Sequence, residues 1–178
     1  YVLFPKDKIS EVQRRFMSTS QANNINIISI DGNFDDCQNI VKSLFKDKAF
    51  SQSVHLSGVN SINWARIMIQ IIYYFSAISQ NPEYKKNPDI IVPTGNFGDI
   101  YAGYIAKKMG LEMGKLVIAT NVNNILERCL NTGRYNILEA IQTNSPSMDI
   151  QISSNFERLL YDLVNQDIKR LSQMMDEL

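Results

Sequence analysis

Short apolar runs alternate with longer segments of helical period along most of the chain. The apolar runs predict five strands, at Tyr1–Phe4, Ile25–Ile30, Ser53–Leu56, Ile90–Val92 and Leu116–Ala119. Helices are predicted in the intervals between them, and this alternation is typical of βα units. The pattern therefore predicts an α/β fold, with a parallel sheet and flanking helices.

Polar residues mark where several of these helices begin. Ser10 and Gln13 have the spacing of a capping box, and Asp35 and Asp36 favour the start of a second helix. Near the C-terminus, the segment Asn155–Leu178 has a helical pattern. Its apolar residues suit one buried face, and they are Phe156, Leu159, Leu160, Leu163 and Ile168.

Two stretches interrupt the pattern of strands and helices. Lys46–Ser53 resembles a linker, and Asn81–Pro88 is predicted to be an exposed turn because prolines bracket it. The long helix expected after the first stretch is apolar on most sides. It is therefore predicted to be a core helix.

Charge and composition exclude several classes of function. The 178 residues include 18 basic and 18 acidic side chains, without the cationic patch that nucleic-acid binding requires. A single histidine, His55, and two distant cysteines, Cys37 and Cys129, argue against a metal site and a Ser-His-Asp triad. The longest apolar stretch, Ile67–Ile78, is too short to span a membrane. We therefore expect a soluble protein of the reducing cytoplasm, with no nucleic acid, membrane or metal as partner.

The most informative segment runs from Asp89 to Gly103. It passes from an apolar strand through a turn containing Gly95 and Gly98 and enters an amphipathic helix. Such a turn directs unpaired N–H groups and the positive end of the helix dipole at an anion. The spacing matches neither the dinucleotide fingerprint nor the P-loop, so we expect a phosphorylated small molecule. The alternative is that the glycines serve only to reverse the chain.

A second candidate anion site lies at the start of the long helix. Asn60 or Ser61 is predicted to cap it, and Asn63, Arg66 and Gln70 form a polar stripe on one face. An arginine on an otherwise apolar helix needs a partner. This partner is either a carboxylate of the same protein or a bound anion. The adjoining cap favours a phosphate.

These segments resemble the threonine synthase family, whose members are pyridoxal-phosphate enzymes of fold type II, also called tryptophan synthase β-like. The resemblance covers nearly the whole chain. It rests on the segments Asp31–Cys37, Asn60–Arg66, Pro93–Asp99, Ile118–Asn123 and Ser145–Ile150.

The resemblance implies the conversion of O-phosphohomoserine and water to L-threonine and phosphate. It also implies that the phosphate of pyridoxal 5'-phosphate is held by Gly95, Asn96, Phe97, Gly98 and Asp99, mainly through backbone N–H groups. Only the N–H of Asp99 is expected to contribute, because a carboxylate beside a phosphate is unfavourable. The substrate's phosphate would be held by Asn60, Ser61 and Arg66, with Asn63 as a weaker candidate.

No catalytic residue is assigned within the chain. The Schiff-base lysine of the family is expected upstream, and Lys42, Lys107, Lys108 and Lys115 suit exposed helix faces or turns. We therefore expect an internal fragment that is inactive alone. Residues 1–50 would belong to the small α/β domain and 51–178 to the large cofactor-binding domain.

Two alternatives remain open from the sequence. One is a non-catalytic α/β module that binds a phosphorylated metabolite. The other is a different fold-type-II lyase, such as threonine dehydratase or cysteine synthase, whose substrates lack this phosphate and would not need Arg66.

Overall fold

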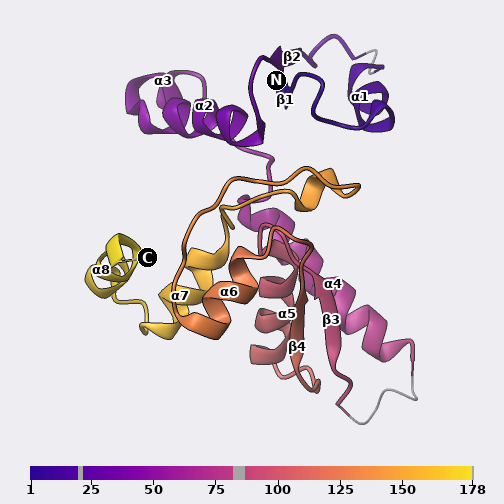
Figure 1. Cartoon of the computed structure of the whole chain (residues 1–178), viewed down its shortest axis with the longest axis vertical. Coiled ribbons are helices and arrows are strands. Elements are labelled where there is room, and N and C mark those ends of the chain that lie inside the picture. The colour runs from indigo at the N-terminus through magenta and orange to yellow at the C-terminus, as the bar shows by residue number, and fades with distance from the viewer. Residues whose placement is uncertain (20–21, 82–86, 178) are drawn as a thin grey trace. The chain divides into compact units, whose positions relative to one another are not determined.

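The computed structural model describes residues 1–19, 22–81 and 87–177, which form two compact units (Figure 1). The units are Tyr1–Ser57 and Gly58–Leu178. The boundary between these two compact units lies between Ser57 and Gly58, and the predicted domain boundary between residues 50 and 51 stays a prediction. The assignment of the units to a small and a large domain stays a prediction.

The first unit contains a pair of parallel strands and three helices. Strand β1 (Val2–Pro5) pairs with β2 (Ile27–Ile30) in a register that places Val2 opposite Ile27. The helices are α1 (Glu11–Ser18), α2 (Phe34–Lys46) and α3 (Lys48–Ser53), and α2 contacts β1. The strands at both positions were predicted, with ends displaced by one or two residues.

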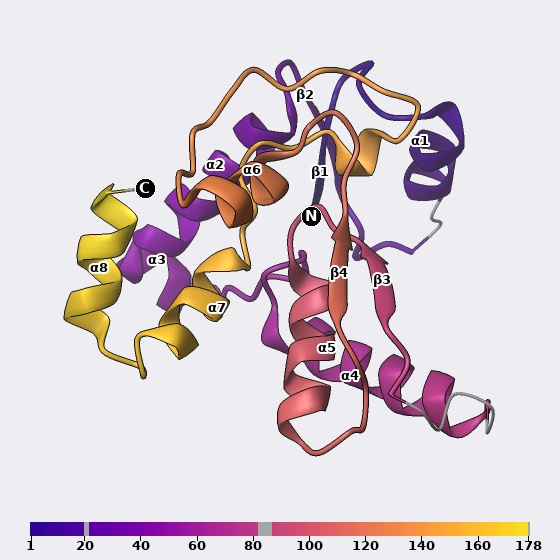
Figure 2. The same ribbon diagram turned by 60° about the horizontal axis from the view of Figure 1, so that its bottom comes forward.

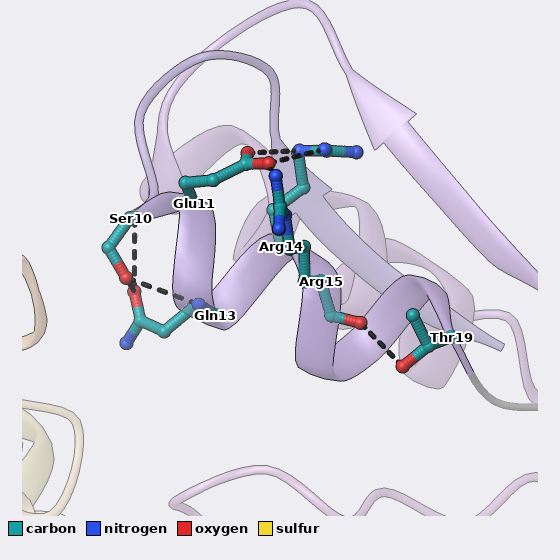
Figure 3. A network of polar contacts seen from close by, with 6 residues as sticks. All are labelled: Ser10, Glu11, Gln13, Arg14, Arg15 and Thr19. Atoms are coloured by element: carbon teal, nitrogen blue, oxygen red, sulfur yellow. Dashed lines mark hydrogen bonds and ion pairs between the residues drawn. The ribbon is translucent and has the colours of Figure 1, made fainter.

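Local hydrogen bonds specify the helix starts in this unit. The capping box of α1 is confirmed: Ser10 Oγ accepts from the Gln13 amide and the Gln13 side chain accepts from the Ser10 amide (Figure 3). Glu11 also pairs with Arg14 and Arg15 at 2.7 Å each. In α2, Asn33 and Asp36 form a second capping box, so the predicted acidic start is also confirmed.

Two predictions around residue 50 are wrong. The expected linker Lys46–Ser53 contains α3, and the expected strand Ser53–Leu56 is the end of this helix followed by a turn. The cause is the Asp47 carboxylate, which accepts a hydrogen bond from the Phe50 amide at 2.9 Å and starts a new helix. His55 therefore lies in a turn with a φ of 49°, and it is exposed.

The second unit contains the other strands and most of the helices. Strand β3 (Ile90–Pro93) pairs in parallel with β4 (Leu116–Ala119), and Val92 lies opposite Ile118. The α-helices are α4 (Trp64–Ser79), α5 (Gly98–Lys108), α6 (Ile125–Thr132), α7 (Phe156–Leu163) and α8 (Ile168–Glu177), and Pro146–Met148 forms a short 3-10 helix. The α/β class and the parallel pairing are confirmed, but the strands are divided between two sheets rather than forming one.

The core of this unit lies where α4 and α5 pack together. The two helices run side by side next to the β3–β4 pair in both views (Figures 1 and 2). Ile67 of α4 and Ala102 of α5 have no exposed surface, and Leu126 of α6 is 1 % exposed. The prediction of a core helix at α4 is therefore confirmed for one of its faces. Its opposite face is exposed, because Met68, Ile69 and Ile72 are each more than half accessible.

The C-terminal segment differs from the single helical pattern that was predicted. It forms two helices separated by Asn165 and Gln166, both with positive φ. Phe156 and Leu160 are buried as expected, whereas Leu163 and Ile168 are exposed. The left-handed backbone at Asn165 and Gln166 ends the first helix, so no single apolar face runs through the segment. The predicted turn at Asn81–Pro88 lies largely outside the described residues.

Candidate functional site

The glycine turn between β3 and α5 presents a row of unpaired backbone donors. The Thr94 amide donates to the Ala119 carbonyl at 2.8 Å, which is the last ladder bond of the sheet. Within the described part of the chain, no oxygen accepts from the amides of residues 95–99. Unpaired N–H groups at a helix start are the ordinary means of holding a phosphate. The predicted cradle therefore has its donors available.

The left-handed backbone of this turn belongs to Phe97 and not to a glycine. Phe97 has a φ of 64° and precedes α5 without a side-chain cap. A non-glycine residue reaches this region only at a cost in conformational energy. Its ring is 6 % exposed and packs edge-on against Phe156 with ring centroids 5.3 Å apart. Burial of the ring thus holds the turn in its strained form.

Gly95 and Gly98 differ in how closely other atoms surround them. A Cβ at Gly95 would lie 3.3 Å from Ile150 Cδ1 and 3.4 Å from the Ser147 carbonyl oxygen. At Gly98, a Cβ would make ordinary contacts, the nearest at 3.4 Å from Asn155 Nδ2. The small size of Gly95 therefore accommodates the chain around residues 147–150. A valine at Gly95 would disturb that packing as well as any bound anion.

Asp99 is engaged by α4 through its carboxylate. The Tyr74 hydroxyl lies 2.9 Å from the Asp99 carbonyl oxygen and 3.2 Å from Oδ1. Burial raises the pKa of the Asp99 carboxyl, and the hydrogen bond from Tyr74 offsets part of this rise. Burial also raises the pKa of the Tyr74 hydroxyl. The Asp99 carboxylate thus has a partner on α4, and the expectation that only its N–H contacts a ligand stays a prediction.

The predicted cap of α4 is wrong by two or three residues. Asn63 is the N-cap, and its Oδ1 accepts from the Ala65 amide at 2.8 Å. Asn60 and Ser61 belong to the preceding turn, where Asn60 Oδ1 accepts from the Ile62 amide at 3.2 Å. The side-chain Nδ2 of Asn63 also donates to the Gly58 carbonyl. These bonds fold the segment before α4 into a turn, so the helix begins later.

Arg66 is exposed in the first turn of α4. Its guanidinium takes part in none of the salt bridges between described residues. Of the two partners considered from the sequence, an internal carboxylate is therefore not found among residues 1–19, 22–81 and 87–177. Because the side chain is exposed, water can solvate the guanidinium, and its contact with a bound anion stays a prediction.

The two candidate segments lie next to each other. The fully buried side chain of Asn155 donates to the carbonyls of Asn96 and Ser61, at 2.9 and 3.0 Å. A Cβ at Gly98 would also lie only 3.7 Å from the Ser61 carbonyl oxygen. The expectation of neighbouring anion sites is thus compatible with the geometry. Which of Asn60, Ser61 and Arg66 contacts a ligand stays a prediction.

Three features of this region were not predicted from the sequence. Asn155 and Ser153 anchor the turn, since Ser153 Oγ donates to the Gly95 carbonyl at 2.8 Å. The Oδ1 atom of Asn96 is buried and has no partner among the described residues. Sequence offers no signal for these contacts, because the partners lie far apart along the chain.

A polar cluster after β4 holds the chain that approaches Gly95. Asn121 and Asn123 donate to the Asp149 carboxylate at 2.8 and 3.1 Å, and Thr143 donates to it twice at 2.7 Å. Burial alone would raise the pKa of Asp149, but these hydrogen bonds outweigh it, and the pKa is lowered. The asparagines therefore fix a loop.

The lysines considered from the sequence are all exposed. Lys108 pairs with Asp162 at 2.9 Å, and Lys107 donates to the Gly114 carbonyl at 2.5 Å. In the described ranges, no group of three or more histidine, cysteine or acidic side chains has the geometry to hold a metal ion. No described helix is long and apolar enough to cross a membrane.

Comparison with known proteins relates the chain to one family, although no family model matches it. It is 49% identical over 176 residues to threonine synthase of Pseudomonas aeruginosa, covering 99% of this chain and 38% of that protein. With threonine synthase of Saccharomyces cerevisiae it shares 49% identity over 169 residues, or 93% of this chain and 33% of the relative. The chain therefore spans little more than a third of the length of these relatives.

Solved structures agree with the sequence relatives. The structure described as PLP-bound threonine synthase from Brucella melitensis is 52% identical, with a TM-score of 0.81 over 98% of this chain and 38% of that one. Threonine synthase from Escherichia coli gives a TM-score of 0.83 at 37% identity, over 94% of this chain and 40% of the other. The resemblance to the threonine synthase family is confirmed, and the chain corresponds to a segment of those proteins.

Proposed function

We propose that the full-length protein containing this chain converts O-phosphohomoserine and water to L-threonine and phosphate. Support comes from the similarity over nearly the whole chain and from the two adjacent anion-binding segments. The observation that carries the proposal is the joint contact of Asn155 with the Ser61 and Asn96 carbonyls, because it keeps the two segments side by side. A cofactor phosphate and a substrate phosphate need two such neighbouring receptors.

In this proposal the glycine turn holds pyridoxal 5'-phosphate. The residues fit such a group: the amides of Gly95, Asn96, Phe97, Gly98 and Asp99 have no acceptor among the described residues. The positive end of the α5 dipole lies at the same place. When bound, the cofactor supplies an electron sink that stabilises carbanions. The contribution of this chain is to seat the phosphate and fix the position of the ring.

The substrate's phosphate is assigned to the start of α4. Arg66 supplies a guanidinium that can form a bidentate pair with phosphate oxygens. Asn60 and Ser61 stand in the turn just before the helix and can contribute a side-chain amide and a hydroxyl. No group of this chain is assigned to proton transfer. The lysine that carries the cofactor is expected elsewhere in the full-length protein.

The same proposal places the reaction in the cytoplasm. Cys37 and Cys129 are both free thiols, and thiols persist in that reducing compartment.

Substitution of Arg66 tests the substrate assignment in the full-length protein. Arg66→Ala should raise KM for O-phosphohomoserine by about tenfold to a hundredfold, since a charge-assisted pair to phosphate is lost. Phosphate release measured over a range of substrate concentrations gives KM and kcat. Arg134→Ala is the matched control, because Arg134 is also exposed and its side chain forms no salt bridge among the described residues. If kcat/KM is the same in Arg66→Ala and in the unaltered protein, the substrate assignment is wrong.

A further inference from the structure

Asn155 uses both donors of its side-chain amide at the junction of the two candidate segments. Its Nδ2 donates to the Asn96 carbonyl at 2.9 Å and to the Ser61 carbonyl at 3.0 Å. Its backbone amide donates to the same Asn96 carbonyl at 3.1 Å. Its Oδ1 accepts from Arg158 Nε at 3.0 Å. The side chain is completely buried, so each of these bonds is made without competition from water.

Arg158 extends this arrangement to the start of α4. Its Nη2 donates to the Ile62 carbonyl at 2.8 Å, and its guanidinium lies 5.7 Å from the centre of the Trp64 ring. The first turn of α7 therefore holds Ser61 and Ile62 through one pair of side chains. Asn155 also holds Asn96 in the glycine turn.

Asn155 donates to the carbonyl oxygens of Ser61 and Asn96, and these bonds also affect the N–H groups of the residues that follow. A peptide plane fixed by its carbonyl also fixes the direction of the N–H of the next residue. The Asn96 carbonyl thus orients the unpaired Phe97 amide, and the Ser61 carbonyl orients the Ile62 amide, which donates to Asn60 Oδ1 and so holds the Asn60 side chain. Both carbonyls are turned toward Asn155.

We propose that Asn155, supported by Arg158, is a positioning residue that sets the spacing between the cofactor-phosphate turn and the substrate-phosphate turn. The role rests on the proposed function, because the two turns are assigned to those ligands there. Asn155 touches neither ligand. It acts through the backbone of Ser61 and Asn96.

The side-chain amide is the only group of this size that suits the site. A carboxylate in its place would set negative oxygens against two carbonyl oxygens and would lose both donors. A leucine would leave the Ser61 carbonyl and Arg158 Nε without their partner, and the Asn96 carbonyl would keep only the backbone amide of residue 155. Either change should displace both turns together.

The test uses the full-length protein with Asn155→Asp and Arg158→Lys. Arg158→Lys keeps the charge, but a single ammonium cannot replace the two guanidinium nitrogens that donate to Asn155 and to Ile62. It serves as the second variant if Asn155→Asp does not fold. Leu160→Ala is the control, because Leu160 is buried in the same helix and belongs to the hydrophobic core. Two quantities are measured for each variant: the dissociation constant of pyridoxal 5'-phosphate from the apoprotein, and the inhibition constant of inorganic phosphate against O-phosphohomoserine.

Both constants should rise about tenfold in Asn155→Asp and in Arg158→Lys, as expected for lost buried hydrogen bonds. In Leu160→Ala the thermal unfolding midpoint should fall, while both constants stay within about threefold of the unaltered protein. In the double variant with Arg66→Ala, the effect of Asn155→Asp on phosphate inhibition should be smaller than in the single variant, because the arginine it helps to place is gone.

Three results would overturn the positioning role. The first is that neither constant changes more in Asn155→Asp and Arg158→Lys than in Leu160→Ala. The second is that only one of the two constants rises. The third is that Arg66→Ala leaves phosphate inhibition unchanged, which overturns the substrate assignment and the positioning role together. If phosphate inhibition weakens in Arg66→Ala but not in the Asn155 and Arg158 variants, the positioning role alone is overturned.

Discussion

Phe97 shows how one residue can combine a backbone cost with a packing gain. Its φ of 64° places it in the left-handed region, where a side chain costs about 1 kcal/mol or more relative to glycine. The buried ring contributes more than this cost, since burial of a phenylalanine is worth roughly 1.5–3 kcal/mol. The turn that presents the free amides is therefore stabilised by hydrophobic packing against Phe156.

This balance predicts that at position 97 a glycine variant is more stable than an alanine variant. Phe97→Ala should lower the free energy of unfolding by about 3–5 kcal/mol, because it loses the ring and keeps the strained φ. Phe97→Gly loses the same ring but relieves the strain, so it should be less destabilising than alanine by about 1 kcal/mol. Urea unfolding of the 178-residue chain, followed by the fluorescence of its only tryptophan, Trp64, measures this difference.

Phe16→Ala is the control for the ring itself, since Phe16 is 85 % exposed and its loss should have little effect. Equal unfolding free energies for Phe97→Gly and Phe97→Ala, or a less stable glycine variant, would show that the left-handed backbone is not a source of strain.

Helix starts show which parts of the fold can be predicted from the sequence. The capping boxes at Ser10 and Asn33 depend on residues within one turn, so the local sequence determines them. The start of α4 was misplaced because Asn60, Ser61 and Asn63 are all good caps. The turn that selects Asn63 involves a bond to the Gly58 carbonyl, which residue preferences do not reveal.

The contact between α4 and α5 depends on a glycine that the sequence left unexplained. A Cβ at Gly103 would lie 2.6 Å from two atoms of the Tyr74 ring, and this ring is 5 % exposed. The ring cannot easily move away, because the Tyr74 hydroxyl donates to Asp99 on the same helix as Gly103. The pair therefore fixes how closely the two helices approach.

A double-mutant cycle tests this contact. Gly103→Ala should lower the free energy of unfolding by about 1–3 kcal/mol through overpacking. In a Tyr74→Leu background the clash is removed, and the same substitution should become neutral or stabilising by up to about 1 kcal/mol, since alanine is the better helix former. Urea unfolding followed at Trp64 gives all four values. An equal cost of Gly103→Ala in both backgrounds would mean that Tyr74 does not limit the approach of the helices.

At the scale of the whole molecule, the candidate site depends on contacts between distant parts of the chain. The Asn155 side chain reaches partners 59 and 94 residues away along the sequence. The glycine turn and the Asn60–Arg66 segment were found from the sequence because each is a local motif. The residue that joins them was not, because a single sequence carries no signal for such a contact. The break between α7 and α8 was missed for the related reason that tertiary packing overrides the helical period.

The two units also differ in how much apolar surface they bury. All members of the buried hydrophobic cluster, from Ile67 to Leu171, lie in the second unit. In the described part of the first unit, Pro5 and Cys37 are the only apolar side chains that are buried, and α1 buries no residue. Because hydrophobic burial is the dominant favourable term in folding, the first unit should be the less stable of the two.

Hydrogen exchange of the 178-residue chain tests this order of stability. Amides of β1, β2 and α2 should exchange at a lower opening free energy than those of α4, α5 and β3, and α1 should exchange first because only local bonds hold it. Brief trypsin treatment should accordingly cut at Arg14 or Lys42 before Lys107, although all three side chains are exposed. Since protease cleavage needs local opening of the backbone, side-chain exposure alone does not decide the order. Earlier cleavage at Lys107, or stronger protection of β1 than of β3, would contradict the assignment of greater stability to the second unit.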